Sequence, residues 1–222
     1  MDSLIKLEDI SFSYKKKNIY NHMNVEINRG DILAVLGHNG AGKTTLLNIM
    51  AGLLKTDKGN IHKESKNLTV GYMNEALGLY PYLSGKENLR LFFLRNGINC
   101  SDKELEELLL SIKIKDDDKV KNYSTGMKRK LSLLGTLVSR AELNLLDEPF
   151  TGIDPVSLEI MIERIKASST RDNAFVIVNH DLASTKKLCN RFVIIKDGEI
   201  VFASDKKEDI DNLEEIYLRY SE

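Results

Sequence analysis

The sequence predicts an α/β fold in which a core of strands and helices carries a smaller, all-helical insertion. Three observations lead to this prediction. Short apolar segments typical of buried strands alternate with helical patterns towards both ends of the chain. Between them, residues 81–141 carry helix-start signals and no strand pattern. The length of 222 residues fits one large domain or two small ones, with room for a hydrophobic core. Alternating strands and helices around a helical stretch indicate a layered α/β core with an inserted subdomain.

The first part of the chain is predicted to form short strands. Residues 4–7 and 25–27 are mostly apolar, and residues 32–36 (ILAVL) form the continuous apolar run that is typical of a buried strand. A glycine-rich turn follows this run. The next apolar stretch, residues 44–54, predicts a helix that ends at Gly59 or just before it.

Two helix-start signals lie in the middle of the chain. Ser84 is followed by Glu87, and Ser101 by Glu104, so both pairs match a capping box, in which the Glu reaches back to the Ser that caps the helix. An apolar pattern with helical spacing follows each pair. We therefore expect an all-helical subdomain over about residues 81–141. Buried strands are expected around it, at residues 68–72, 143–146, 174–178 and 191–195.

Composition excludes several classes of protein. Hydrophobic residues make up 42% and charged residues 29%, as in an ordinary globular chain. Lys+Arg 32 against Asp+Glu 33 gives a net charge of −1, which argues against nucleic acid as a partner. Cys100 and Cys189 are too few for a disulfide framework and lack metal-ligand spacing, so reduced thiols in the cytosol are expected. The most apolar stretch, residues 46–54, is far shorter than the ~20 residues that cross a bilayer.

A phosphate-binding loop is the strongest chemical signal. Residues 37–44 (GHNGAGKT) match G-x-x-x-x-G-K-[ST] and lie between a predicted strand and a predicted helix, the context that this pattern requires. The glycines allow backbone N–H groups to point at phosphates, beside the positive end of the helix. Lys43 is expected to bridge the β- and γ-phosphates, and the Thr44 hydroxyl to bind Mg²⁺. The alternative is a glycine-rich turn that carries Lys-Thr by chance. The candidate residues are Gly37, His38, Asn39, Gly40, Ala41, Gly42, Lys43 and Thr44.

A pair of acids ends the apolar strand predicted at residues 143–146. Parallel strands present ligand-binding side chains at their carboxyl ends, so Asp147 is the expected Mg²⁺ partner. Glu148 is the candidate general base that activates the attacking water. Asp-Glu-Pro after a strand is also a plausible polar turn, but the phosphate loop upstream favours the catalytic interpretation.

Residues 123–128 (YSTGMK), just before this strand, resemble the signature motif of the ATP-binding-cassette (ABC) family, whose usual form is L-S-G-G-Q. The other elements of the family occur in order and extend the resemblance over essentially the whole chain. Tyr14 resembles the aromatic residue that stacks on adenine, and Glu75 stands at the position of the Q-loop glutamine. Residues 152–154 (GID) resemble the D-loop, which ends in Asp154, and His180 resembles the switch histidine.

The resemblance implies a single ABC ATPase domain over residues 1–222, with a P-loop NTPase (RecA-like) core, an N-terminal antiparallel β-subdomain and the helical insertion. It also implies that two cassettes sandwich ATP between the phosphate loop of one copy and the signature of the other (Ser124, Thr125, Gly126, Met127), so the working unit is a dimer, with itself or a related subunit. Glu75 joins Thr44 and Asp147 as an implied Mg²⁺ ligand, and Thr45 joins the nucleotide-binding residues. Glu148, His180 and Glu75 are the implied catalytic residues.

Single elements also have structural interpretations. Tyr14 can cover a strand edge, and His180 can be a loop residue before a helix that Asp181 caps. Ser124 is expected to cap a helix as well as to bind phosphate, and Asp154 with the following proline is a good helix start. Residues 15–17 (KKK) are expected to form a solvated turn.

Three positions depart from the family pattern. Thr125 replaces the first signature glycine and Met127 the glutamine, while Ser124 retains the hydroxyl for the γ-phosphate. Glu75 replaces the Q-loop glutamine and adds a negative charge near the phosphates. These variants, with residues 213–218 (LEEIYL), resemble the ATPase subunits of antibiotic and peptide exporters.

The predicted function is therefore ATP hydrolysis that powers a membrane exporter. The transmembrane permease is expected on a separate polypeptide, which would hold this chain at the cytoplasmic face of the cell membrane. Three alternatives stay open: an importer subunit, a soluble ABC ATPase acting on ribosomes or DNA, and a non-hydrolysing nucleotide-binding regulator. The near-zero charge and the single cassette disfavour the ribosome or DNA alternative.

Overall fold

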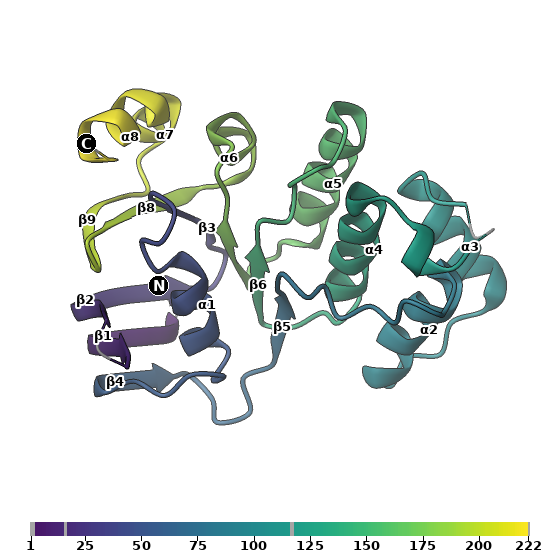
Figure 1. Ribbon diagram of the computed structural model, residues 1–222, viewed down its shortest axis with the longest axis horizontal. Helices are drawn as coiled ribbons and strands as arrows, with labels where there is room; N and C mark the ends of the chain where they lie inside the picture. Colours follow the sequence, from purple (N-terminus) through teal and green to yellow (C-terminus); the bar gives the residue numbers. More distant parts are fainter. Residues whose placement is uncertain (1–2, 16, 116–117, 222) are drawn as a thin grey trace.

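The computed structural model of the protein describes residues 3–15, 17–115 and 118–221. The elements in chain order are β1 (Ser3–Tyr14), β2 (Lys17–Asn28), β3 (Ile32–Leu36), α1 (Lys43–Met50), β4 (Lys58–Lys63), β5 (Val70–Met73), α2 (Gly85–Arg95), α3 (Asp102–Ser111), a 3₁₀ turn (Val120–Asn122), α4 (Thr125–Leu137), β6 (Leu143–Asp147), α5 (Pro155–Ser168), β7 (Ala174–Val178), α6 (Leu182–Leu188), β8 (Arg191–Lys196), β9 (Glu199–Ser204), α7 (Lys207–Asp211) and α8 (Leu213–Ser221). Figure 1 shows an elongated molecule in which the sheets, with α1, α6, α7 and α8, occupy one end and α2 and α3 form the other.

Two sheets form the strand-containing end. An antiparallel sheet has the order β2-β1-β4, and a six-stranded sheet has the order β5-β6-β7-β3-β8-β9. Every pairing in the larger sheet is parallel except that of β9 with β8. Asp147 pairs with Val178, and Val178 pairs with Val35, so the carboxyl ends of β6, β7 and β3 lie at one edge. The predicted site residues follow these strands in the chain, so they lie at this edge of the sheet.

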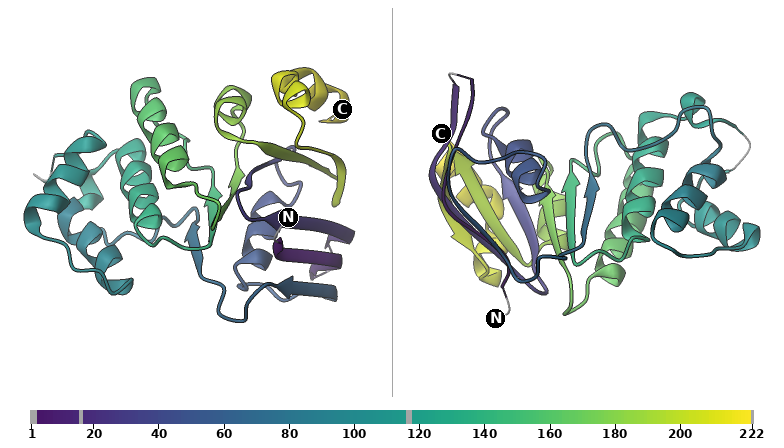
Figure 2. Two further views of the ribbon diagram at one scale, coloured as in Figure 1. Left: turned by 180° about the vertical axis from the view of Figure 1, so that it is seen from behind. Right: turned by 90° about the horizontal axis from the view of Figure 1, so that it is seen from below.

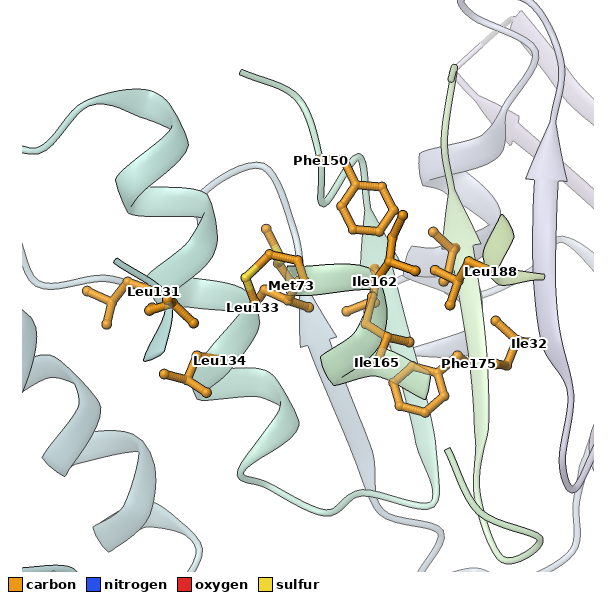
Figure 3. Close-up of a cluster of buried hydrophobic side chains, with 14 of the residues drawn as sticks. Ile32, Met73, Leu131, Leu133, Leu134, Phe150, Ile162, Ile165, Phe175 and Leu188 are labelled. Carbon is orange, nitrogen blue, oxygen red and sulfur yellow. The ribbon is translucent and has the colours of Figure 1, made fainter. Parts of the chain in front are cut away.

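Burial on both faces explains the continuous apolar strands. All five residues of β3, β6 and β7 are buried, as expected for central parallel strands. Alternate residues of β3 point to opposite faces, so Ile32 and Leu36 join one core cluster while Leu33 and Val35 join the other. Figure 3 shows the first cluster, in which Ile165 of α5 packs with side chains of the sheet and of α4. The second cluster joins α1 to the antiparallel sheet.

The predicted helical subdomain consists of α2, α3 and α4. It lies at the opposite end of the molecule from the antiparallel sheet in all three views (Figures 1 and 2). Both predicted capping boxes are present. The amide nitrogen of Glu87 lies 3.2 Å from Oγ of Ser84, and that of Glu104 lies 3.3 Å from Oγ of Ser101. Each glutamate carboxylate also accepts a hydrogen bond from the backbone of its serine. Local sequence thus determines where α2 and α3 begin.

The structure corrects several predicted boundaries. The strands predicted at residues 4–7 and 25–27 belong to the longer β1 and β2, whose partly exposed, polar residues hide the strand pattern. The predicted helix over residues 44–54 ends at Met50, where the chain turns through Gly52 at φ +75°. The strand β4 was missed because its residues are mostly exposed and polar. None of the helices in the described ranges is long and apolar enough to cross a membrane.

Candidate active site

The phosphate loop connects β3 to α1 and owes its shape to glycine. Gly42 precedes the helix at φ +102°, a conformation that other residues rarely adopt, and no side chain caps the first turn. A Cβ atom at Gly37 would lie 2.4 Å from the carbonyl oxygen of Ile195, and one at Gly42 would lie 2.8 Å from Oη of Tyr20. The loop therefore packs directly on β8 and β2. The start of α1, which has no side-chain cap, is the kind of helix end that binds anions.

Lys43 folds back over this loop. Its side chain is buried, and Nζ donates hydrogen bonds to the carbonyl oxygens of Gly37 (2.8 Å) and His38 (2.9 Å). Burial lowers the pKa of Lys43, and the charges of Glu148 and Asp147 partly offset this effect. A cation held over an anion-binding loop suits phosphate oxygens.

Asp147 ends β6 as a buried acid. Burial raises the pKa of the Asp147 carboxyl, and a hydrogen bond with Thr44 opposes that shift. The negative charges of Glu148 and Glu75 raise it further, while the Lys43 cation lowers it. A carboxylate beside a threonine hydroxyl provides hard oxygen ligands, which is the donor chemistry that Mg²⁺ prefers next to phosphates. The residues present therefore fit this metal ion.

Glu148 is held in a specific orientation. Its backbone has φ +48°, and its amide donates to the carbonyl of Val178 at 2.9 Å. One carboxylate oxygen, Oε1, lies 3.0 Å from Nε2 of His180, and the other, Oε2, accepts a hydrogen bond from Oγ1 of Thr151 at 3.1 Å. Both Glu148 and His180 are partly exposed, so the pair faces a cavity rather than the core.

The loop that carries His180 is fixed by its neighbours. Nδ2 of Asn179 donates to the hydroxyls of Ser184 (2.8 Å) and Thr185 (3.2 Å) in α6. Asp181 accepts hydrogen bonds from the amides of Ala183 and Ser184 and so caps α6, as the sequence predicted. The histidine position is therefore set by a capped helix start and a buried amide.

Lys43, Glu148 and His180 line one cleft of about 320 Å³ at the carboxyl edge of the sheet. Asp147, which bonds Thr44 of that lining, is buried and is not itself part of the lining. Most predicted nucleotide-binding residues line the cleft, together with Glu148 and His180, but three loop residues do not. Gly37 packs against the carbonyl of Ile195, Ala41 is buried, and the carbonyl of His38 accepts a hydrogen bond from Lys43. The lining residues are Tyr14, Lys17, Ile19, Asn39, Gly40, Gly42, Lys43, Thr44, Thr45, Glu148, Val178 and His180. A larger hollow of about 430 Å³ lies at the opposite edge, where it contains none of them.

The signature and D-loop residues lie outside this cleft but contact each other. Oγ of Ser124 accepts a hydrogen bond from the amide of Met127 at 3.2 Å and caps α4. Gly126 lies so close to the D-loop that a Cβ atom there would be 2.4 Å from the carbonyl oxygen of Gly152. Asp154 caps α5 by accepting from the amide of Ser157 at 2.9 Å. Glu75 is exposed in the turn after β5 and reaches the site through its charge on Asp147.

Comparison with known proteins decides the family. Residues 20–151 match the family model described as ABC transporter. The chain belongs to the ABC transporter family. The uncharacterized ABC transporter ATP-binding protein YdbJ of Bacillus subtilis is 32% identical over 211 residues, which cover 90% of this chain and 68% of that protein. The lantibiotic transport ATP-binding protein SrtF of Streptococcus pyogenes is 29% identical over 222 residues and covers 96% of both chains.

Solved structures agree with this assignment. A structure described as the ATP-binding subunit of an ABC transporter superposes with a TM-score of 0.87 at 25% identity, and the match covers 99% of this chain and 100% of that one. A dimeric ATP-binding cassette bound to ADP and Pi superposes with a TM-score of 0.78 at 22% identity, over 90% of this chain and 97% of that one. The predicted family, its cassette fold and its ATPase class are confirmed.

Three residues of this ABC cassette escaped the sequence analysis. Tyr20, buried under the phosphate loop, donates a hydrogen bond to the carbonyl of Gly42, and burial raises its pKa. Thr151 and Arg129 both contact Glu148. Tyr20 gave no local signal, because an aromatic residue in a strand is ordinary. Thr151 lies three residues after Glu148, a spacing at which a side chain can bond back across a turn.

Proposed function

We propose that the chain is the ATP-hydrolysing subunit of a membrane ABC exporter. The observation that carries this proposal is the meeting of Lys43 and Asp147 with the Glu148–His180 pair at one edge of the sheet. Export is supported by the likeness of the whole chain to a lantibiotic transport protein. The Glu75 and signature variants, which resemble those of antibiotic and peptide exporters, support it as well.

The nucleotide is held from both ends in this proposal. Tyr14, half-exposed and edge-on to Phe12 at 4.9 Å, stacks on the base. The loop amides and Lys43 bind the phosphates. Thr44, Asp147 and Glu75 would hold Mg²⁺, which supplies neutralisation of the charge on the β- and γ-phosphate oxygens. The residues assigned to ATP are Tyr14, Gly37, His38, Asn39, Gly40, Ala41, Gly42, Lys43, Thr44 and Thr45.

Glu148 is the general base. Its carboxylate accepts a proton from water while the water oxygen bonds to the γ-phosphorus, and the bond from that phosphorus to the β-γ bridging oxygen breaks to release ADP. His180, which now bonds Glu148, turns to the γ-phosphate and stabilises its developing negative charge. The positive helix end that Lys43 begins acts on the same charge.

A second cassette completes the site. Ser124, Thr125, Gly126 and Met127 lie at the start of α4, outside the cleft of their own chain, and are assigned to the nucleotide of a partner copy. Asp154 of the D-loop is assigned to the same interface between the two copies. A nucleotide-sandwich homodimer therefore forms on ATP binding and reopens after hydrolysis. The likeness to a dimeric cassette supports this arrangement.

The remaining partner is a permease on another polypeptide, which holds the cassette at the cytoplasmic face of the membrane. The test is to purify the tagged chain from detergent-solubilised membranes. We expect a polypeptide with several apolar spans to co-purify and to stimulate ATP hydrolysis. Co-purification of ribosomes or DNA in place of such a polypeptide would contradict the proposal. Accumulation of substrate by cells, rather than its loss, would contradict export and favour an importer.

A further inference from the structure

The carboxylate of Glu148 is anchored by more than the histidine. The turn after it closes with a hydrogen bond from the amide of Thr151 to the carbonyl of Glu148 at 3.4 Å. The Thr151 hydroxyl then folds back to Oε2 of the same residue at 3.1 Å. Arg129 of α4 donates from Nη1 to the carbonyl of Glu148. Thr151 thus holds both the side chain and the backbone of the base, and Arg129 holds the backbone from a second side.

Given the proposed role of Glu148 as the base, we propose that Thr151 and Arg129 are positioning residues for this carboxylate, and that Arg129 ties it to the helix that carries the signature.

Thr151 sets the direction of the carboxylate. His180 occupies Oε1 and Thr151 occupies Oε2, so the two oxygens have different partners. When His180 turns to a γ-phosphate, the Thr151 hydrogen bond persists, because it is formed within one turn of chain. Oε1 is then released toward the cleft, where it can accept the proton of a water. A freely rotating carboxylate would spend much of its time in other orientations.

Arg129 acts on the backbone. The backbone of Glu148 has φ +48°, a conformation that residues with a Cβ atom rarely adopt. Contacts with neighbouring residues are therefore needed to hold it. Nε of Arg129 is buried and has no hydrogen-bond partner, and no carboxylate of the described residues lies within ion-pairing distance of its guanidinium. The Glu148 carbonyl is therefore the acceptor that the structure provides for this cation.

The same contact has a wider consequence. Arg129 lies in α4, the helix that Ser124 caps, and Gly126 of that helix packs against Gly152, next to Thr151. The base and the signature are thus parts of one packed unit. If α4 shifts when Ser124 binds the partner's nucleotide, Arg129 would move with it and displace Glu148 of the same chain.

The test measures kcat and KM for ATP in full-length Thr151→Val, Thr151→Ser, Arg129→Met and Arg129→Lys, with Thr170→Val and Arg171→Met as controls at exposed positions. We expect Thr151→Val and Arg129→Met to lower kcat about tenfold, which corresponds to ~1.4 kcal/mol of transition-state stabilisation, with KM nearly unchanged. Thr151→Ser retains the hydroxyl and Arg129→Lys retains a charged donor, so both should recover most of the lost rate.

Glu148→Gln in the same assay separates two failures. If Glu148→Gln is inactive while Thr151→Val and Arg129→Met hydrolyse ATP at the unmodified rate, the positioning role is wrong and the base stands. If Glu148→Gln is active, the base itself is wrongly assigned. Equal loss of kcat in Thr151→Ser and Thr151→Val, at unchanged melting temperature, would also overturn the role of the hydroxyl. Should Arg129→Met not fold, a rate for Arg129→Lys below a tenth of the unmodified rate would overturn the role of Arg129 as a charged donor.

Discussion

Nε2 of His180 lies 3.0 Å from Oε1 of Glu148, although 31 residues lie between them in the chain. The contact exists because β6 and β7 are neighbours and Asp147 pairs with Val178 at their carboxyl ends. Each residue follows its strand by one or two positions and emerges at the same edge. The assigned base and the residue assigned to the γ-phosphate are therefore in contact in this structure, and with these assignments ATP would compete with Glu148 for the imidazole.

Removing the charge of Glu148 should separate binding from turnover. Glu148→Gln retains the shape of the side chain but cannot accept a proton from water, so we expect ATP hydrolysis to fall by about a hundredfold or more. The variant should bind ATP and stay as a closed dimer. Phosphate release and size-exclusion chromatography with ATP measure the two properties. Glu163→Gln, at an exposed position of α5, is the matched control. Normal ATP hydrolysis by Glu148→Gln would show that Glu148 is not the general base.

Ser124→Arg should abolish hydrolysis without abolishing binding. Ser124 is exposed at the start of α4 and lies outside the cleft of its own chain, so a bulky cation there blocks the partner's nucleotide and not its own. Equilibrium binding of a fluorescent ATP analogue, measured at protein concentrations that favour the monomer, should be close to that of the unmodified chain. Asn99→Arg, in an exposed loop, controls for the added charge. A parallel loss of binding and hydrolysis would contradict the shared site.

Asp147→Asn should stabilise the nucleotide-free protein while it abolishes Mg²⁺-dependent hydrolysis. The fold raises the pKa of Asp147, chiefly through burial, so the ionised form is less favourable in the folded than in the unfolded state. The resulting loss of stability is absent at a pH below the ordinary pKa of the group and appears as the pH rises through the raised value. Asparagine removes the charge at neutral pH, so the melting temperature without ligand should increase. Asp205→Asn, at an exposed position, should leave it unchanged. A lower melting temperature for Asp147→Asn would show that this carboxylate stabilises the apo fold.

The core between the sheet and α5 should depend on Ile165. This side chain is fully buried in the cluster of Figure 3, so Ile165→Ala should lower the free energy of unfolding by about 2–5 kcal/mol. Val156→Ala removes an apolar group from the same helix at a position that is 59% exposed, and should change it by less than about 0.5 kcal/mol. Urea titration followed by circular dichroism measures both. Equal effects would place Ile165 outside the stabilising core.

The sequence alone was sufficient to predict structure that depends on a local arrangement. The phosphate loop, both capping boxes, and the caps Ser124, Asp154 and Asp181 each need only a few consecutive residues, and all five helix caps form as predicted. Central strands were predictable because burial on both faces demands continuous apolar runs. The edge strands β4 and β9 were not predicted. The residues of β4 are mostly polar and exposed, as in a loop, and β9 (EIVFAS) lacks the continuous burial of the central strands.

The contacts of Tyr20 and Arg129 could not be predicted, for a different reason. Tyr20 meets Gly42 only because β2 runs under the loop, and Arg129 meets Glu148 only because α4 packs beside the end of β6. Neither pairing follows from spacing along the chain. The functions assigned to Glu75 and to the signature also depend on partners that a single chain does not contain, so they stay predictions.

The order in which the cleft is assembled has a consequence for biosynthesis. Its walls come from residues as early as Tyr14 and as late as His180, and the strand that carries His180 inserts between β3 and β6. A nascent chain that has exposed only its phosphate loop lacks β7 of the sheet and the residues that we assign to the γ-phosphate. High ATP affinity can therefore arise only after most of the polypeptide has left the ribosome. In the cell, bound nucleotide would stabilise completed chains, whereas truncated chains would lack this stabilisation and stay open to proteases.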